Sequence, residues 1–199
     1  MPWNTYIAMV GECLQNLTVI DSQGRSLDPL SGFAMLCEMT ARAKRRKKTV
    51  FLLGNGASAS MASHVAADLA KNGGVRTEVF TDVSLLTAIG NDISFDEIFS
   101  EPLRRKMIQG DLLVAISSSG MSPNVVLAST AARQLGGGVV TVSAMSPDNH
   151  LRRLGDLNFH VPAETYSLAE SCHAALLHFW IDQMVAQEQP VALARVRNV

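Results

Sequence analysis

The amino-acid sequence predicts an α/β protein whose parallel sheet is covered by helices on both faces. Two observations lead to this prediction. Short apolar segments bounded by Gly, Asp, Ser or Pro alternate with longer helical segments, which is typical of parallel strands joined by helical crossovers. The chain has 199 residues, of which 47% are hydrophobic, so it can bury the core of one domain of this class.

Two helices are expected before the first strand. The first covers Asn4–Ile20, where apolar residues recur with a period near 3.6. A polar break that contains glycine follows at Asp21–Asp28, and Pro29 then opens a second helix that runs to about Lys47. Both helices carry an apolar stripe, so we expect them to pack on the main domain or on a second subunit.

Five strands are predicted after these helices, each rich in Val, Leu, Ile or Phe. They cover Thr49–Leu53, Arg76–Phe80, Asp111–Ser117, Gly138–Ser143 and Leu157–Val161. The helical segments are Ser58–Asn72, Phe95–Ile108, Pro123–Leu135, a short turn near Asn149–Leu154, and Leu168–Glu188. The chain is therefore expected to be a single domain. A helical pair (1–47) precedes an αβα core (48–189), and a frayed or separately packed tail (190–199) follows it.

The charge pattern argues against a protein that binds nucleic acid through bulk electrostatics. The formal net charge is −1 at pH 7. One basic run, residues 42–48, could contact phosphate. Such a run is more often a solvated helix end whose cations lie near the negative end of the helix dipole.

The three cysteines, Cys13, Cys37 and Cys172, indicate a reducing compartment. They are odd in number and far apart, which fits free thiols better than a disulfide framework. The N-terminus lacks a basic segment followed by an apolar one, and no apolar run reaches about 18 residues. We therefore expect a cytoplasmic protein with no signal peptide and no membrane span.

A glycine turn after the first predicted strand is the first candidate for ligand binding. Gly54, Asn55 and Gly56 let the backbone come close to a ligand. Ser58 places a hydroxyl at the N-terminus of the next helix, where anions bind well.

The helix after this turn carries His64 and Asp68 on one face, because the two residues are four positions apart. The pair could be metal ligands or an acid–base pair. It could equally be a surface ion pair or a structural hydrogen bond, and the spacing alone does not separate these possibilities.

A second loop, residues 116–124, ends the third predicted strand and opens a helix. Its serines are Ser117, Ser118, Ser119 and Ser122. Ser122 is a favourable N-cap and Pro123 a favourable first helical residue. Hydroxyls, amides and a positive helix end can hold a phosphate dianion without Lys or Arg. The alternative is a capped turn. The position at the carboxyl end of a central strand, where ligands bind in open α/β sheets, favours phosphate.

The last predicted helix contributes three further candidates, Glu170, His173 and His178. Eight residues place His178 within about 80° of Glu170 around the helix axis, while His173 points to the other side of Glu170. Each has a structural alternative. The segment Ser167–Glu170 matches a capping box, and a single helical histidine is more often packed or solvent-facing than a ligand.

Together these segments resemble the SIS (sugar isomerase) domain family, specifically its phosphoheptose isomerase branch. The resemblance covers nearly the whole chain, including the N-terminal helices. The matching segments are residues 54–59, 64–69, 86–92, 116–125 and 161–178.

The resemblance implies a three-layer αβα fold and a homotetramer with active sites between subunits. It implies phosphate binding by the hydroxyls of five residues, Ser58, Ser117, Ser118, Ser119 and Ser122. Asp92 matches an acidic residue near the sugar, and Asn55 and Gly56 of the glycine turn complete the predicted substrate site.

The resemblance also implies a zinc site. His64 and His178 match histidine ligands, and His178 also matches an acid. Asp68 stands where the family has a glutamate that acts as ligand or base, and Glu170 stands where it has a glutamine ligand. A set of two imidazoles and two carboxylates remains a chemically sound zinc site.

The sequence as a whole therefore predicts a sugar-phosphate aldose–ketose isomerase. It would convert sedoheptulose 7-phosphate to heptose 7-phosphate, or a related long-chain sugar phosphate, through an enediol. Asp68 or Glu170 would move the proton between C1 and C2, and His178 would exchange protons with the sugar oxygens. Two further differences from the family, Ser167 for an aspartate and Asn72 for an arginine, bear on the substrate more than on the chemistry.

The alternative is a non-catalytic SIS binding protein similar to the DnaA initiator-associating protein. A sugar-phosphate-sensing regulatory domain is a weaker alternative, because no DNA-binding segment accompanies the fold. A binding protein needs no acid–base set, so the joint presence of His64, Asp68, Glu170 and His178 favours an enzyme.

Overall fold

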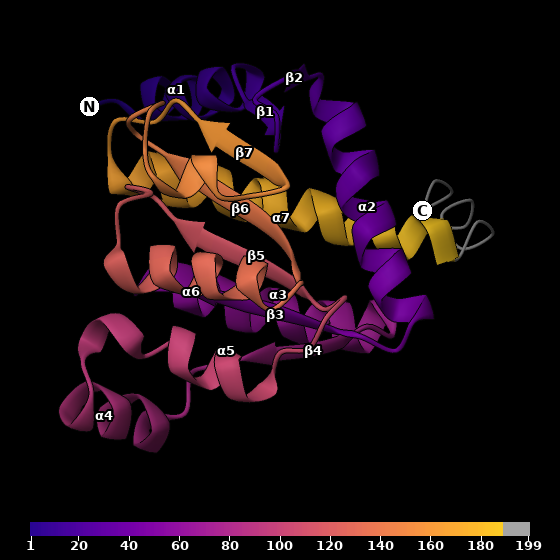
Figure 1. Cartoon of the computed structure of the whole chain (residues 1–199). Helices are drawn as coiled ribbons and strands as arrows, with labels where there is room; N and C mark the ends of the chain where they lie inside the picture. Colours follow the sequence, from indigo (N-terminus) through magenta and orange to yellow (C-terminus); the bar gives the residue numbers. More distant parts are fainter. Residues whose placement is uncertain (189–199) are drawn as a thin grey trace.

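A seven-stranded sheet runs through the molecule, with helices on both of its faces (Figure 1). The computed structural model describes residues 1–188. The strands lie in the order β2-β1-β7-β6-β5-β3-β4. In chain order the elements are α1 (Trp3–Gln15), β1 (Thr18–Asp21), β2 (Ser26–Leu27), α2 (Pro29–Arg45), β3 (Thr49–Gly54), α3 (Ala57–Gly73), β4 (Arg76–Val79), α4 (Val83–Asp92), the 3-10 helix η1 (Phe95–Glu97), α5 (Ser100–Lys106), β5 (Leu112–Ser117), α6 (Pro123–Gln134), β6 (Gly138–Ala144), the 3-10 helix η2 (Leu151–Arg153), β7 (Leu157–Val161) and α7 (Tyr166–Glu188).

The five predicted strands form the parallel part of the sheet, in the order β4-β3-β5-β6-β7. Successive residues of β3 enter different cores, because side chains alternate across a strand. Val50 and Leu52 pack with α2, α3 and α7, whereas Phe51 and Leu53 pack with α4, α5 and α6. The predicted α/β fold, with a parallel sheet covered on both faces, is therefore confirmed.

The sheet has seven strands rather than the predicted five. The two additional strands, β1 and β2, lie in the segment that was predicted as the end of the first helix and the polar break after it. α1 stops at Gln15, and Thr18–Asp21 forms β1, which pairs antiparallel with both β7 and β2. Thr, Val and Ile are stiff, β-branched residues that suit a strand, and here they cover the outer edge of β7. The Asp21 carboxylate closes the hairpin turn by accepting hydrogen bonds from the Gln23 and Arg25 amides.

The predicted helix at Phe95–Ile108 is also divided differently. Helix α4 precedes it, capped by the Asp82 carboxylate, which accepts the Leu85 amide. The chain then turns through η1, where the Ser94 hydroxyl accepts the Asp96 amide, before the short helix α5 begins. The predicted helix therefore consists of η1 and α5, and α4, which lies before it, was not predicted. The predicted turn near Asn149–Leu154 is confirmed as η2.

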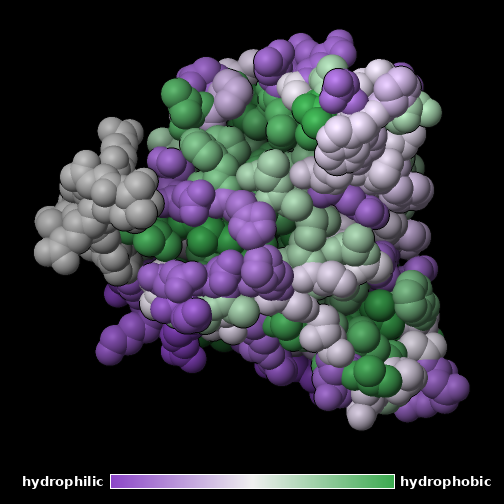
Figure 2. All heavy atoms as spheres, turned by 180° about the vertical axis from the view of Figure 1, so that it is seen from behind, coloured by the Kyte–Doolittle hydropathy of each residue, from purple (hydrophilic) through white to green (hydrophobic). Residues whose placement is uncertain are grey.

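Exposed apolar side chains gather on two parts of the surface. Seen from behind, hydrophobic atoms cross the middle of the molecule, and a second patch lies at the lower corner where Figure 1 places α4 (Figure 2). In the α4 region Val83, Ile93 and Phe95 are exposed, and on α1, at the top of the molecule in Figure 1 and apart from the middle band, Trp3 and Ile7 are exposed. Such patches are candidate contact surfaces.

None of the helices within residues 1–188 is both long and apolar enough to cross a membrane. The predicted tail at 190–199 lies outside the described residues. That the chain forms a single domain stays a prediction.

Candidate functional site

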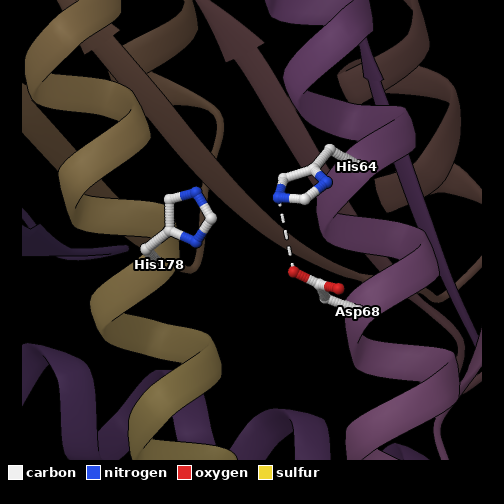
Figure 3. Close-up of side chains that lie close together, drawn as sticks. All are labelled: His64, Asp68 and His178. Atoms are coloured by element: carbon white, nitrogen blue, oxygen red, sulfur yellow. Dashed lines mark ion pairs between the residues drawn. The ribbon is translucent and has the colours of Figure 1, made fainter.

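Three candidate residues meet between helices α3 and α7. His64 and Asp68 project from one face of α3, and His178 faces them from α7 (Figure 3). The His64 Nε2 atom lies 3.4 Å from Asp68 Oδ2, and the centroids of the His64 and His178 rings are 5.2 Å apart. One ligand atom from each residue lies within 4.8 Å of the other two.

This cluster fits a divalent metal ion. In a tetrahedral site with bonds of about 2.0–2.2 Å the ligand atoms lie about 3.3–3.6 Å from one another, so side-chain rotations that draw the three atoms closer together would bring them onto one ion. Two imidazoles and one carboxylate are a donor set used in catalytic zinc sites. The His64 side chain is 57% exposed and that of Asp68 28%, so the cluster is open to solvent.

The serine loop forms a separate cavity at the carboxyl ends of β3 and β5, with a volume of about 140 Å³. Its lining residues are Asn55, Ser58, Ile116, Ser117, Ser118, Ser119, Ser122, Tyr166 and Glu170. Seven of the predicted site residues therefore share one cavity. Its hydroxyls lie beside the N-termini of α3 and α6, an arrangement that suits an anion.

Hydrogen bonds within the loop fix the serine hydroxyls. The Ser117 hydroxyl accepts the Gly120 amide and lies 3.2 Å from the Ser122 hydroxyl. The Ser119 hydroxyl accepts the Met121 amide. Ser122 occupies the N-cap position of α6, as predicted, but its side chain makes no capping hydrogen bond. Its hydroxyl is therefore left to face Ser117 and the cavity.

Gly120 shapes the loop because no other residue fits there. Its φ is +61°, in the left-handed region that favours glycine. A Cβ atom at this position would lie 2.0 Å from Asn149 Oδ1. Asn149 is buried and cannot easily move, because its side chain donates to Ser143 and Ser146 and accepts the Arg152 amide.

Asn124, which was not predicted as a site residue, couples the two ligand loops. The side-chain amides of Asn55 and Asn124 exchange two hydrogen bonds of 2.9 and 3.1 Å across 69 residues of sequence. Asn124 is 1% exposed, so this pair is an internal link between the glycine turn and the serine loop. Tyr166, which lines the cavity, was also missed. Asn124 lay in the serine-loop segment, but nothing in the sequence named its partner.

Glu170 lies in the serine cavity and is not among the three clustered metal-ligand candidates. Eight residues separate it from His178 on α7, which is about 12 Å along the helix axis. The alternative role of Glu170 in a capping box does not hold, because α7 begins at Tyr166 and the Thr165 hydroxyl accepts the Leu168 amide. The Glu170 carboxylate is therefore left for the cavity.

Two predicted substrate residues lie apart from these groups. Asp92 is exposed at the end of α4, where it accepts a hydrogen bond from the Asn91 side chain. It is not among the residues that line the serine cavity. Gly56 is exposed at the start of α3, next to Asn55, and is not a lining residue either.

His173 turns away from the site into the core. It is fully buried, and within residues 1–188 neither ring nitrogen has a hydrogen-bond partner. Burial lowers the pKa of His173 from 6.5 to about 4. Burial also lowers the pKa of His160, and the charge of Arg152 adds to that effect. His173 is therefore a structural residue with a consequence for stability.

We expect this burial to make the fold acid-sensitive. The unfolded chain binds a proton on His173 near pH 6.5, whereas the folded chain does so only near pH 4, so stability falls as the pH falls between these values. The loss at pH 5 relative to pH 7 is about 2 kcal/mol for this one histidine. Urea unfolding of wild type and His173→Leu at both pH values measures it.

The matched control is His150→Gln, because His150 is exposed. The His150→Gln variant should keep the wild-type pH dependence of the unfolding free energy. The His173→Leu variant should lose most of the decrease of about 2 kcal/mol that His173 contributes between pH 7 and pH 5. An unchanged pH dependence in His173→Leu would contradict this assignment.

Comparisons with known proteins agree with the fold and the loops. Residues 28–144 match the family model described as SIS domain. Phosphoheptose isomerase from Campylobacter concisus is 36% identical over 157 residues, which cover 75% of this chain and 82% of the relative. That from Geotalea daltonii is 33% identical over 171 residues, covering 82% and 87%.

A solved structure gives the same result. Phosphoheptose isomerase from Neisseria gonorrhoeae superposes with a TM-score of 0.78 at 28% identity, covering 92% of this chain and 94% of that one. The SIS match includes His64, Asp68 and the serine loop, and the longer similarities span most of each relative. The chain therefore belongs to the SIS domain family, within its phosphoheptose isomerase branch.

Proposed function

We propose that this protein is a sugar-phosphate isomerase that interconverts an aldose and a ketose, with a seven-carbon or related long-chain sugar phosphate as substrate. The observation that carries the proposal is that two helices serve both parts of the site. Helix α3 supplies Ser58 to the serine cavity and His64 to the cluster, while α7 supplies Glu170 and His178 in the same way. Relatives of similar length are named phosphoheptose isomerases.

The serine cavity is the proposed phosphate site. Ser58, Ser117 and Ser118 are each 5% exposed, so their hydroxyls are held in place before the substrate arrives. Hydroxyls and helix N-termini bind a dianion without a cationic side chain. Fixing the phosphate at one end would leave the carbonyl end of a long sugar to extend toward the cluster of His64, Asp68 and His178.

Isomerisation needs one base and one group that exchanges protons with oxygen. A carboxylate removes the proton from the carbon beside the carbonyl and returns it to the neighbouring carbon, while the two oxygens trade one proton. Asp68 and Glu170 are the carboxylates of the site, and His178 is the proposed partner of the oxygens. Asp68 is nearer to His178, because both belong to the same cluster.

A metal ion, which we propose to be zinc, would be held by His64, Asp68 and His178, with Glu170 as the further ligand candidate. When bound, it supplies Lewis-acid polarisation of a carbonyl oxygen. The chain's own residues orient the sugar and move its protons.

The proposed assembly is a homotetramer with sites between subunits. Its support is that apolar side chains are exposed on α1 and near α4, and that the cluster is open to solvent. The proposed location is the cytoplasm, since Cys13, Cys37 and Cys172 are buried free thiols.

The experiment is a conversion assay with a panel of seven- and eight-carbon ketose phosphates. Protein purified without chelator is expected to convert at least one of them to the aldose, and to lose that activity in chelator and regain it with zinc. A metal-loaded, folded protein that converts none of the panel would contradict the proposal. A protein that binds a panel member tightly without converting it would indicate a non-catalytic binding protein.

A further inference from the structure

A second cavity lies at the opposite edge of the sheet, where the parallel strands begin. Its volume is about 440 Å³, roughly three times that of the serine cavity. The end of α2, the loop before β5 and the turn between α6 and β6 surround it. We call it the basic cavity. Its size falls within the range of about 300–1,000 Å³ that is typical of small-molecule sites.

Three cations line the basic cavity, namely Arg42, Arg46 and Lys48. Arg42 and Arg46 are four residues apart at the end of α2, so they share one face of the chain. None of the three forms an ion pair with another residue of the described part of the chain. Their charges are therefore available to an anion.

Asp111 is the carboxylate of this lining, and it does not neutralise the cations. Its two oxygens accept hydrogen bonds from the backbone amides of Thr49 and Ile108, at 2.9 and 2.8 Å. The residue is 3% exposed and makes no ion pair with any residue from 1 to 188. It holds the rim of the cavity together and leaves the lining with an excess of positive charge.

The walls of the basic cavity suit a ligand that is larger than a single phosphate. One wall is bare backbone, because it consists of Gly136, Gly137 and Gly138. Two buried apolar side chains, Met39 and Leu112, contribute a non-polar floor. A polar mouth above a non-polar floor fits an organic body that carries its charge at one end.

Helix-dipole stabilisation alone does not explain these cations. Cations near a helix C-terminus are favourable, and that reason applies to Arg45 as well. Arg45, however, is 2.6 Å from Glu38 in an ion pair and does not line the cavity. Its neighbours Arg42 and Arg46 lack such partners among the described residues and face the cavity.

We propose that the basic cavity is a second anion-binding site, which takes a ligand with a diphosphate group on an organic body of nucleotide size. Two guanidinium groups can bind phosphoryl oxygens in a bidentate manner, and Lys48 adds a third charge. The diphosphate supplies enough negative charge for three cations, and the body lies against Met39 and Leu112. Because the net charge of the chain is −1, the protein as a whole does not attract nucleic acid, and the attraction for the ligand comes from the cations of the basic cavity.

The experiment is calorimetric titration of the full chain with ADP at physiological ionic strength, with AMP and pyrophosphate as comparators. ADP is expected to bind with saturation, and more tightly than AMP or pyrophosphate. Arg42→Gln combined with Arg46→Gln should weaken ADP binding at least tenfold. Arg45→Gln, which removes a charge from the same run, should change it less than threefold. Ser118→Ala combined with Ser122→Ala should leave it unchanged.

Each other result overturns part or all of the proposal. Equal weakening by Arg45→Gln would indicate non-specific attraction, and loss of binding in the serine variant would place ADP in the serine cavity. If AMP bound as tightly as ADP, the site would not recognise the diphosphate group. If pyrophosphate bound as tightly as ADP, the site would not recognise the organic body. Absence of binding at millimolar ADP would refute the site. Thermal unfolding equal to that of Arg45→Gln shows that the double variant is folded.

Discussion

Asp68→Asn is expected to lower kcat for sugar-phosphate isomerisation by at least about 100-fold, since a positioned acid or base contributes about 10²- to 10⁴-fold. Asp68 lies 3.4 Å from His64 and belongs to the cluster with His178, so its carboxylate is either a base or a metal ligand. The amide keeps the shape and removes both capacities. Because Asp68 is partly exposed, its replacement should leave the thermal unfolding midpoint nearly unchanged.

Asp68→Glu separates carboxylate chemistry from side-chain length. It keeps the charge and adds one methylene, so it should retain at least tenfold more activity than Asp68→Asn. Asp96→Asn is the matched control, because Asp96 is exposed and belongs neither to the cluster nor to the lining of the serine cavity, and it should behave as wild type. Metal content completes the test. Full metal without turnover in Asp68→Asn identifies a base, and loss of metal identifies a ligand. Wild-type kcat in both Asp68 variants would remove Asp68 from the chemistry.

Gly120→Ala is the second change with a large expected effect, of about 2–3 kcal/mol in unfolding free energy together with a raised KM. A left-handed conformation costs a non-glycine residue about 1–2 kcal/mol. The added Cβ would also lie 2.0 Å from the buried, hydrogen-bonded Asn149 side chain. Moving the loop would displace the Ser117 hydroxyl, which accepts the Gly120 amide, and so weaken phosphate binding. Urea unfolding and steady-state kinetics measure the two effects.

Gly11→Ala provides the control for this substitution. Gly11 lies within α1, and a Cβ there would meet nothing within 4 Å. Alanine should stabilise that helix by up to about 1 kcal/mol and leave KM unchanged. If Gly120→Ala folded and bound substrate as well as Gly11→Ala, the rigid-loop account would be wrong.

The sequence predicts the parallel strands well because their signal is local. A buried run such as the one from Val50 to Leu53 is apolar at every position, and the glycine turn after it marks its end. Strand β1 was not predicted, because its signal is not local. Val19 and Ile20 continue the apolar spacing of the first helix, and only pairing with β7, far along the chain, makes them a strand.

The candidate site divides in the same way. His64 and Asp68 share a helix face, so their proximity follows from spacing alone. The approach of His178 and the link between Asn55 and Asn124 depend on how distant elements pack, which no local pattern states. Glu170 shows the limit most clearly. Its place on the last helix is confirmed, but the capping role that the sequence left open for it does not hold, because α7 begins two residues earlier than the pattern indicates.

The pairing of β1 with β7 also bears on how the chain is made. Thr18 lies opposite His160 in this ladder, 142 residues away. During synthesis the N-terminal segment leaves the ribosome first, yet its partner is among the last strands to emerge. Closing such a long loop slows folding and leaves an apolar segment without its partner in the meantime. Strand β1 therefore lacks its partner β7 until most of the chain has been synthesised.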